Sequence, residues 1–276
     1  MKVDKDLLKL YSIHSVSGTD GEKEICDWLC KRLEELKVTF NRRDNTIFKL
    51  TGTTDVLLSA HLDQVKTEGK AEHFYLLDKR YIVGYNSSYK RTSLGADDKN
   101  GVWIILKLLE QGLDFDFIIS ESEEVGCKGI AKVEADLAQI APEYSFCIVL
   151  DRRGTKEILN RGSTGKYCEA LAQNLKNFWG GAYSIGSGSI SDTATICKYI
   201  ESVNLSVAYE KAHTSMESTD YKALVSIKED VAEAVTNFMH YPSPSYEYLS
   251  KDKGYTTTGN RYFNSLSHGG YYDGWL

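Results

Sequence analysis

The chain has 276 residues, of which 42% are apolar and 26% charged, a balance typical of a globular protein and not of a disordered or collagen-like one. Its 33 Lys and Arg against 39 Asp and Glu give a formal net charge of −6. This charge argues against a nucleic-acid partner, because such binding depends on neutralising phosphates. The length suits one large α/β domain, or two small ones if a segment is inserted.

No apolar run approaches the ~20 residues that a membrane-spanning helix needs, and the longest, residues 102–109, is interrupted by Lys107. The first 15 residues are mixed in charge and lack the pattern of a secretory signal, so we expect a cytoplasmic protein with no membrane partner. The six cysteines are then expected to be free and mostly buried. Cys26 and Cys30 have no second Cys or His pair at zinc-finger spacing, so no structural zinc is expected there.

The amino-terminal half reads as helices followed by short strands. Ser17–Thr19 form a turn before an amphipathic helix whose apolar residues, Ile25 to Leu36, recur at helical spacing. The predicted elements here are a helix at 5–11, strands at 46–50 and 56–60, and a hairpin with arms near 73–77 and 80–84.

The carboxy-terminal half alternates buried strands with helices. Strands are predicted at 115–120, 146–151 and 206–210, and helices at 100–110, 128–138, 192–201 and 219–239. This alternation predicts an α/β fold, a three-layer α/β/α sandwich with a mostly parallel mixed central sheet, in a single domain.

The last 36 residues differ from the rest in composition. Residues 241–276 hold seven of the 18 tyrosines and two of the three prolines, and they show no periodicity. We therefore divide the chain into a catalytic domain at 1–240 and a Tyr/Gly/Ser-rich irregular tail at 241–276. An aromatic segment that lines a substrate cleft or forms a dimer contact is the alternative for the tail.

Two polar segments follow apolar runs in the first half. His61 and Asp63 lie two residues apart after a strand, where a carboxylate can hold the second ring nitrogen of a metal-bound imidazole. The alternative is a surface pair. Asp97 and Asp98 directly precede a helix, where they could bind metal or merely cap the helix and oppose its dipole.

Three further segments follow strands in the second half. A strand that is predicted to be buried ends in Glu121, Glu123 and Glu124. Such crowded carboxylates need a cation or a raised pKa. The alternative is an exposed acidic loop. Asp151 ends the next buried strand, and His213 follows a short one. The other four histidines read as structural or exposed.

Five of these residues lie at or just after strand ends, which converge on one crevice in an open α/β sheet. They are His61, Asp97, Glu124, Asp151 and His213. Two neutral imidazoles and three carboxylates match two zinc ions that share a bridging carboxylate, each with a position open for water.

Short motifs in these segments resemble those of the co-catalytic di-zinc exopeptidase clan, which contains peptidase T, glutamyl aminopeptidases and bacterial leucyl aminopeptidases. The motifs are AHLD, GADDKNG, SEEVG, VLD and AHTSME, in the clan's order over residues 58–217. The segment SVSGTDGEKEICDWL resembles the clan's usual first helix.

The resemblance implies a role for each matched residue. Asp97 would bridge both metals, His61 and Asp151 would complete one site, and Glu124 and His213 the other. Asp63 would orient His61, and Glu123 would be the general base that takes a proton from metal-bound water.

The chain also departs from the larger members of that clan. Only about 35 residues separate Asp63 from Asp97, and 62 positions separate Asp151 from His213. These intervals are too short for the inserted lid of the glutamyl type or the dimerisation domain of the peptidase T branch. The preferred side chain and the oligomeric state therefore stay open.

We expect a metallopeptidase, most simply an aminopeptidase on short peptides, with two divalent ions. Zinc suits the ligand set, and cobalt or manganese would also fit it. Two alternatives stay open: a metal-dependent amidohydrolase that removes acyl groups from N-acyl amino acids or sugars, and a non-catalytic binding module on the same fold.

Overall fold

The computed structural model describes residues 2–162, 165–166, 168–188 and 191–240. The tail expected at 241–276 lies outside the described residues. Within them, no helix has both the length and the apolar character that crossing a membrane requires. The six cysteines are all free, and Cys26, Cys30, Cys147 and Cys168 are buried.

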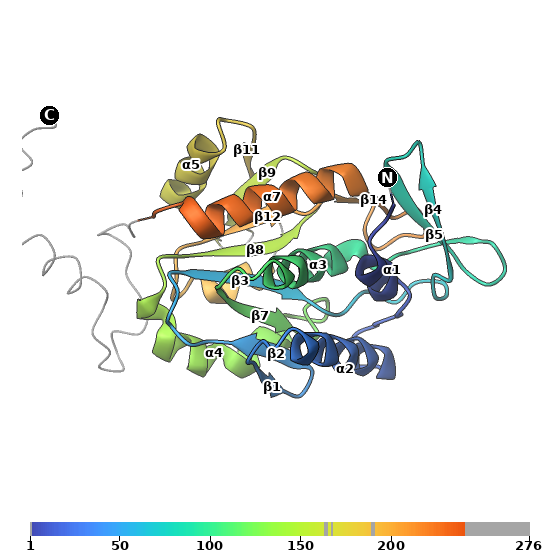
Figure 1. Ribbon diagram of the computed structural model, residues 1–276, viewed down its shortest axis with the longest axis horizontal. Helices are drawn as coiled ribbons and strands as arrows, with labels where there is room; N and C mark the ends of the chain where they lie inside the picture. Colours follow the sequence, from blue (N-terminus) through green and yellow to red (C-terminus); the bar gives the residue numbers. More distant parts are fainter. Residues whose placement is uncertain (1, 163–164, 167, 189–190, 241–276) are drawn as a thin grey trace, which may run out of the picture.

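The main sheet has nine strands with a parallel centre and antiparallel edges (Figure 1). The four central strands β7, β3, β8 and β12 are mutually parallel, and β2 and β9 flank them antiparallel. In spatial order the strands are β1 (Asn41–Arg43), β2 (Thr46–Lys49), β7 (Asp116–Ser120), β3 (Val56–His61), β8 (Phe146–Arg152), β12 (Ser202–Ser206), β9 (Glu157–Gly162) and β10 (Gly165–Lys166), with β11 (Ser184–Ser187) paired to β9.

Helices cover both faces of this sheet. One face packs against α4 (Lys128–Ile140) and α6 (Thr193–Ile196). A short 3₁₀ turn at Ala141–Glu143 follows α4. The other face packs against α1 (Lys5–Tyr11), α2 (Asp20–Glu35), α3 (Ala96–Glu110), α5 (Glu169–Phe178) and α7 (Tyr221–Asn237). The predicted three-layer α/β/α sandwich is confirmed.

Alternation along the buried strands explains the two apolar layers. In β3, Leu57 belongs to the core under α4, and the next residue, Leu58, belongs to the core under α3. Ile118 and Ile119 of β7 divide in the same way. Successive side chains of a strand point to opposite faces, so a strand buried on both sides is apolar throughout. The ionisable residues of these two strands, His61 and Asp116, lie at the strand ends.

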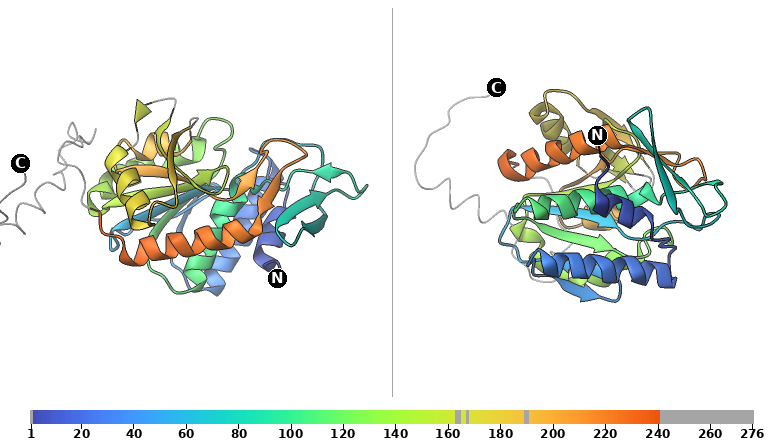
Figure 2. Two further views of the ribbon diagram at one scale, coloured as in Figure 1. Left: turned by 90° about the horizontal axis from the view of Figure 1, so that it is seen from above. Right: turned by 45° about the vertical axis from the view of Figure 1, so that its right-hand side comes forward.

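A second, antiparallel sheet lies to the right in Figure 1 and projects from the main body in Figure 2. Its strands are β4 (His73–Leu77), β5 (Tyr81–Tyr85), β6 (Arg91–Thr92), β13 (Tyr209–Glu210) and β14 (Ser218–Asp220). The predicted hairpin is confirmed, with left-handed backbone at Asp78 and Lys79 in its turn. Because β14 pairs with β5, the segment that contains His213 is brought to the segment that precedes Asp97.

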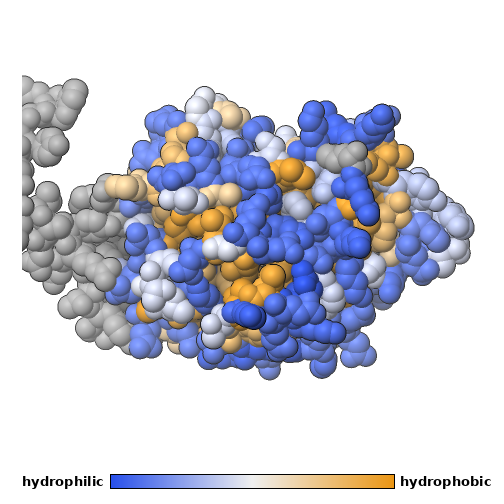
Figure 3. Space-filling model, in the orientation of Figure 1, coloured by the Kyte–Doolittle hydropathy of each residue, from blue (hydrophilic) through white to orange (hydrophobic). Residues whose placement is uncertain are grey.

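Three details differ from the sequence prediction. The strand predicted at 206–210 is wrong: β12 ends at Ser206, and the left-handed backbone of Ala208 turns the chain into β13 of the second sheet. The helix predicted at 192–201 spans only Thr193–Ile196. Four described elements between residues 157 and 187, β9, β10, α5 and β11, are not predicted from the sequence. Figure 3 shows a mainly polar face in which apolar residues gather around α3.

Candidate metal centre

All of the predicted ligands meet at the carboxyl end of the parallel strands. His61 is the last residue of β3, Glu124 lies in the loop after β7, and Asp151 lies in β8. Asp97 and His213 come from the beginning of α3 and the segment after β13. Their ligand atoms form two groups, His61–Asp97–Asp151 and Asp97–Glu124–His213, and within each group every atom lies within 4.8 Å of the others.

His61 is the centre of the first group, and its side chain is 2% exposed. Its Nε2 lies 3.4 Å from Asp97 Oδ1 and 3.6 Å from Asp151 Oδ1. On the other side of the ring, Nδ1 lies 3.1 Å from the backbone oxygen of Asp63 and 3.4 Å from its Oδ1. Asp63 is therefore placed as its predicted orienting role requires.

The second group shares Asp97 with the first. Nε2 of His213 lies 3.2 Å from Asp97 Oδ2 and 2.8 Å from Glu124 Oε1. One oxygen of Asp97 thus faces His61 and the other faces His213. The side chain of His213 is 48% exposed, so this group opens to solvent while the first is enclosed.

The two adjacent aspartates at the beginning of α3 have different surroundings. Asp98 is fully buried, and its carboxylate accepts hydrogen bonds from the backbone N–H of His61 at 3.2 Å and of Gly101 at 3.0 Å. Asp98 therefore caps the helix, whereas Asp97 faces the imidazoles. The capping alternative thus applies to Asp98, and the metal-binding prediction is left to Asp97. The peptide bond between them is cis.

Glu123 lies beside the two groups but belongs to neither. Its Oε2 is 3.9 Å from Nε2 of His61, and its Oε1 accepts a weak hydrogen bond from the Cys127 thiol at 3.6 Å. With Cys127 and Asp192 it forms a third group of possible ligands among the described residues. Asp192 accepts a hydrogen bond from the Ser120 hydroxyl.

The crowding of carboxylates perturbs their protonation in the metal-free protein. Burial, together with the nearby carboxylates of Asp151, Asp192 and Glu124, raises the pKa of Glu123 to about 9. Burial also raises the pKa of Asp151 to about 7. Hydrogen bonds to Asp97 and Glu124 raise the pKa of His213 to about 10. The site therefore needs protons or cations to offset its negative charge.

His61 gives the clearest indication of which cation fits. Its Nε2 is buried and has no hydrogen-bond partner among the described residues, although it faces the carboxylates of Asp97 and Asp151. An orphaned buried imidazole nitrogen among carboxylate oxygens suits a transition metal. The donor set of nitrogen and oxygen atoms matches zinc.

The supporting contacts of two acidic residues were not predicted from the sequence. Besides contacting His61, Asp63 accepts the backbone N–H groups of Glu123 at 2.9 Å and Glu124 at 3.2 Å. Glu217, which is 1% exposed, accepts the backbone N–H of Asp97 at 3.2 Å. The acid in AHTSME is visible in the sequence, but its partner depends on the pairing of β14 with β5.

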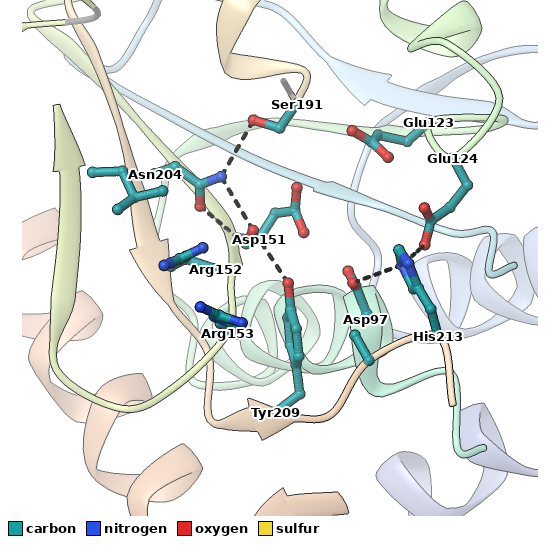
Figure 4. Close-up of a pocket in the computed structure, with 12 residues that line it drawn as sticks. Asp97, Glu123, Glu124, Asp151, Arg152, Arg153, Ser191, Asn204, Tyr209 and His213 are labelled. Carbon is teal, nitrogen blue, oxygen red and sulfur yellow. Dashed lines mark hydrogen bonds and ion pairs between the residues drawn. The ribbon is translucent and has the colours of Figure 1, made fainter. Parts of the chain in front are cut away.

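A cavity of about 220 Å³ opens beside the ligands. Figure 4 shows Glu124 and His213 on one side of it, and Arg152 and Arg153 on the other side of Tyr209. Asn204, behind Asp151, donates to the Asp151 backbone oxygen at 3.1 Å.

The fold is similar to that of solved peptidase structures. A tripeptidase from Staphylococcus aureus has a TM-score of 0.65 and 18% identity, covering 83% of this chain and 95% of the other. The TET1 dodecamer of Pyrococcus horikoshii has a TM-score of 0.68 and 14% identity, covering 86% and 100%. A Zn-dependent exopeptidase from Parabacteroides distasonis has a TM-score of 0.60 and 17% identity, covering 84% and 95%. No family model and no curated sequence matches the chain. The fold expected from the resemblance to the di-zinc exopeptidase clan is confirmed.

Proposed function

We propose that the protein is a metal-dependent exopeptidase, an aminopeptidase that acts on short peptides with two divalent ions. The observation that supports this most strongly is the pair of imidazole–carboxylate groups that share Asp97 while Glu123 stands beside both. A shared carboxylate between two groups is the arrangement that a two-metal hydrolase uses. The likeness to solved peptidase structures supports the same reading.

The residues of the first group are enclosed, and in the second group only His213 is largely exposed. His61, Asp97 and Asp151 would hold one ion, and Asp97, Glu124 and His213 the other. When bound, the ions would polarise the scissile carbonyl and lower the pKa of water to about 7. Zinc suits this set, and cobalt or manganese are the other candidates.

Glu123 is the proposed general base. Its carboxylate is free of both groups and close to them, so it can take a proton from water and give it to the leaving amine without leaving a metal unbound. Positive ions nearby would also oppose the burial that keeps Glu123 protonated in the metal-free protein. Asp63 keeps this loop in position through the N–H groups of Glu123 and Glu124.

The test is hydrolysis by zinc-loaded and chelator-treated protein. We expect cleavage of aminoacyl-naphthylamides or dipeptides, its loss on chelation, and its return with zinc. His73, stacked on Tyr89 away from the site, supplies the control: His73→Ala keeps activity, whereas His61→Ala loses it. Cleavage of N-acyl amino acids alone would favour the amidohydrolase, and chelator-resistant or absent hydrolysis would contradict the proposal.

A further inference from the structure

Two arginines line the cavity that the ligands otherwise make acidic. Arg152 and Arg153 follow Asp151 directly in the sequence, and both reach the same cavity as Glu124 and His213. Figure 4 shows the arginines on the opposite side of the cavity from that pair. The proposed reaction assigns a role to neither arginine.

The two guanidinium groups differ in what they contact. Nε and one terminal nitrogen of Arg152 each lie 2.9 Å from the Glu157 carboxylate. Arg153 is exposed, and within the described ranges its guanidinium makes no hydrogen bond or ion pair. A guanidinium is always charged, and its planar fork of donors matches a carboxylate. Arg153 is therefore free to bind an anion in the cavity.

The backbone that supports the two arginines is fixed. Four hydrogen bonds of 2.7 to 2.9 Å join residues 152–154 to residues 206–209. They include Val207 N–H to the Arg152 oxygen, and the Ser206 hydroxyl to the Arg153 oxygen. When Arg153 binds a ligand, only its side chain loses conformational freedom, because its backbone is already held by these hydrogen bonds.

The size of the cavity limits what this anion can be. A volume of about 220 Å³ lies below the ~300–1,000 Å³ common for small-molecule sites, so only a short part of a substrate fits beside the ligands. An anion bound at Arg153 is then close to the bond that is cleaved.

We propose that Arg153 binds a carboxylate of the substrate. The protein then prefers short peptides that have a carboxylate close to the cleaved bond. This inference rests on the proposed function and adds the class of substrate to it. The carboxylate has two possible sources, the carboxyl terminus of a dipeptide or tripeptide and the side chain of an Asp or Glu residue.

Pairs of substrates that differ in one carboxylate separate these sources. Ala-Ala is compared with Ala-Ala amide, and glutamyl-p-nitroanilide with glutaminyl-p-nitroanilide. For zinc-loaded protein we expect kcat/KM to favour the carboxylate in one pair by about 10- to 100-fold, the size of one charge-assisted hydrogen-bonded contact. The pair that responds identifies the source.

The matching variants assign the preference to Arg153. Arg153→Gln should raise KM for the carboxylate substrate more than for its neutral partner, so that the preference is lost, because uniform binding changes KM. Arg153→Lys keeps the charge without the planar fork and should retain part of the preference. Lys156→Gln removes an exposed cation of the same loop that does not line the cavity, and should change nothing.

A binding measurement makes the result independent of turnover. Calorimetry compares the Glu123→Gln protein with the double variant Glu123→Gln/Arg153→Gln. The double variant should bind the carboxylate ligand with a weaker Kd and bind the corresponding amide with the same Kd. Equal kcat/KM and equal Kd for both members of both pairs would overturn the inference while leaving peptide hydrolysis intact. If no peptide is hydrolysed, the proposed function fails, and the Kd comparison still decides whether Arg153 binds a carboxylate.

Discussion

The buried carboxylate of Glu217 is expected to hold Asp97 in the position that serves both metal groups. One of its oxygens accepts the Ser93 hydroxyl at 2.6 Å and the Leu94 N–H at 2.8 Å, and the other accepts the Asp97 N–H at 3.2 Å. In Glu217→Gln the amide oxygen can serve only one of these sides. If it keeps Ser93 and Leu94, the new NH₂ group faces the N–H of Asp97, and that buried donor loses its partner.

The size of the effect follows from that lost partner. A buried donor without an acceptor costs about 1–3 kcal/mol, which lowers Tm by roughly 2–12 °C in a domain of this size. Burial raises the pKa of Glu217, so the neutral amide recovers part of that cost and the lower end of the range is expected. Loss of a supporting hydrogen bond typically weakens metal binding about 10- to 100-fold. Because Asp97 belongs to both groups, both ions should be affected.

Calorimetric titration of the metal-free protein with zinc, beside thermal unfolding, separates positioning from stability. Ser93→Ala removes one donor to Glu217 but keeps the bond to Asp97, so it should lower Tm slightly and leave zinc affinity almost unchanged. Glu110→Gln removes a carboxylate from the surface and is the charge control. A Glu217→Gln protein that lost stability but bound both ions normally would refute the positioning role.

Three further predictions concern the ligands themselves. Glu123→Gln should retain two ions and lose on the order of 10²–10⁴ in kcat, whereas Glu124→Gln should weaken one ion; elemental analysis beside kcat checks both. Asp97→Ala should lose both ions and Asp151→Ala only one, and tight binding of two zinc ions by Asp97→Ala would disprove the bridge. In metal-free protein the raised pKa of His213, about 10 against ~6.5 unfolded, gives stability that is complete below pH ~6.5 and lost as pH rises to about 10. The Tm difference between wild type and His213→Gln should therefore shrink from pH 6 to pH 10, and a constant difference would contradict this.

The ligands could be predicted from sequence because the central strands are buried on both faces. In β3 and β7 apolar residues occupy both core layers, so the first ionisable residue after the apolar run lies near the end of the strand. The carboxyl ends of parallel strands share one edge, so the positions of His61, Glu124 and Asp151 at or after the ends of β3, β7 and β8 predict that they meet. No contact between distant residues has to be known for this step.

The supporting residues could not be predicted in the same way. Glu217 reaches Asp97 only because β14 pairs with β5, and nothing local in AHTSME specifies that register. Arg153 reads as an ordinary surface charge until the loops of residues 152–154 and 206–209 are seen to be joined. The prediction of one strand at 206–210 failed for a related reason, because the left-handed turn at Ala208 has no glycine to mark it.

Left-handed backbone at residues other than glycine also occurs in the ligand segments. Ser122, Cys127 and His213 have left-handed backbone without being glycine, and each lies within or next to the ligand segments. Such residues cost about 1–3 kcal/mol each and persist where the surroundings fix them, most often at functional sites. Glu123 and Asp151 add buried carboxyl groups, and burial raises their pKa values to about 9 and about 7 although His61 lies nearby. Protons or bound cations offset such crowding. The proposed pair of metal ions would supply those cations at the place where the backbone is also left-handed.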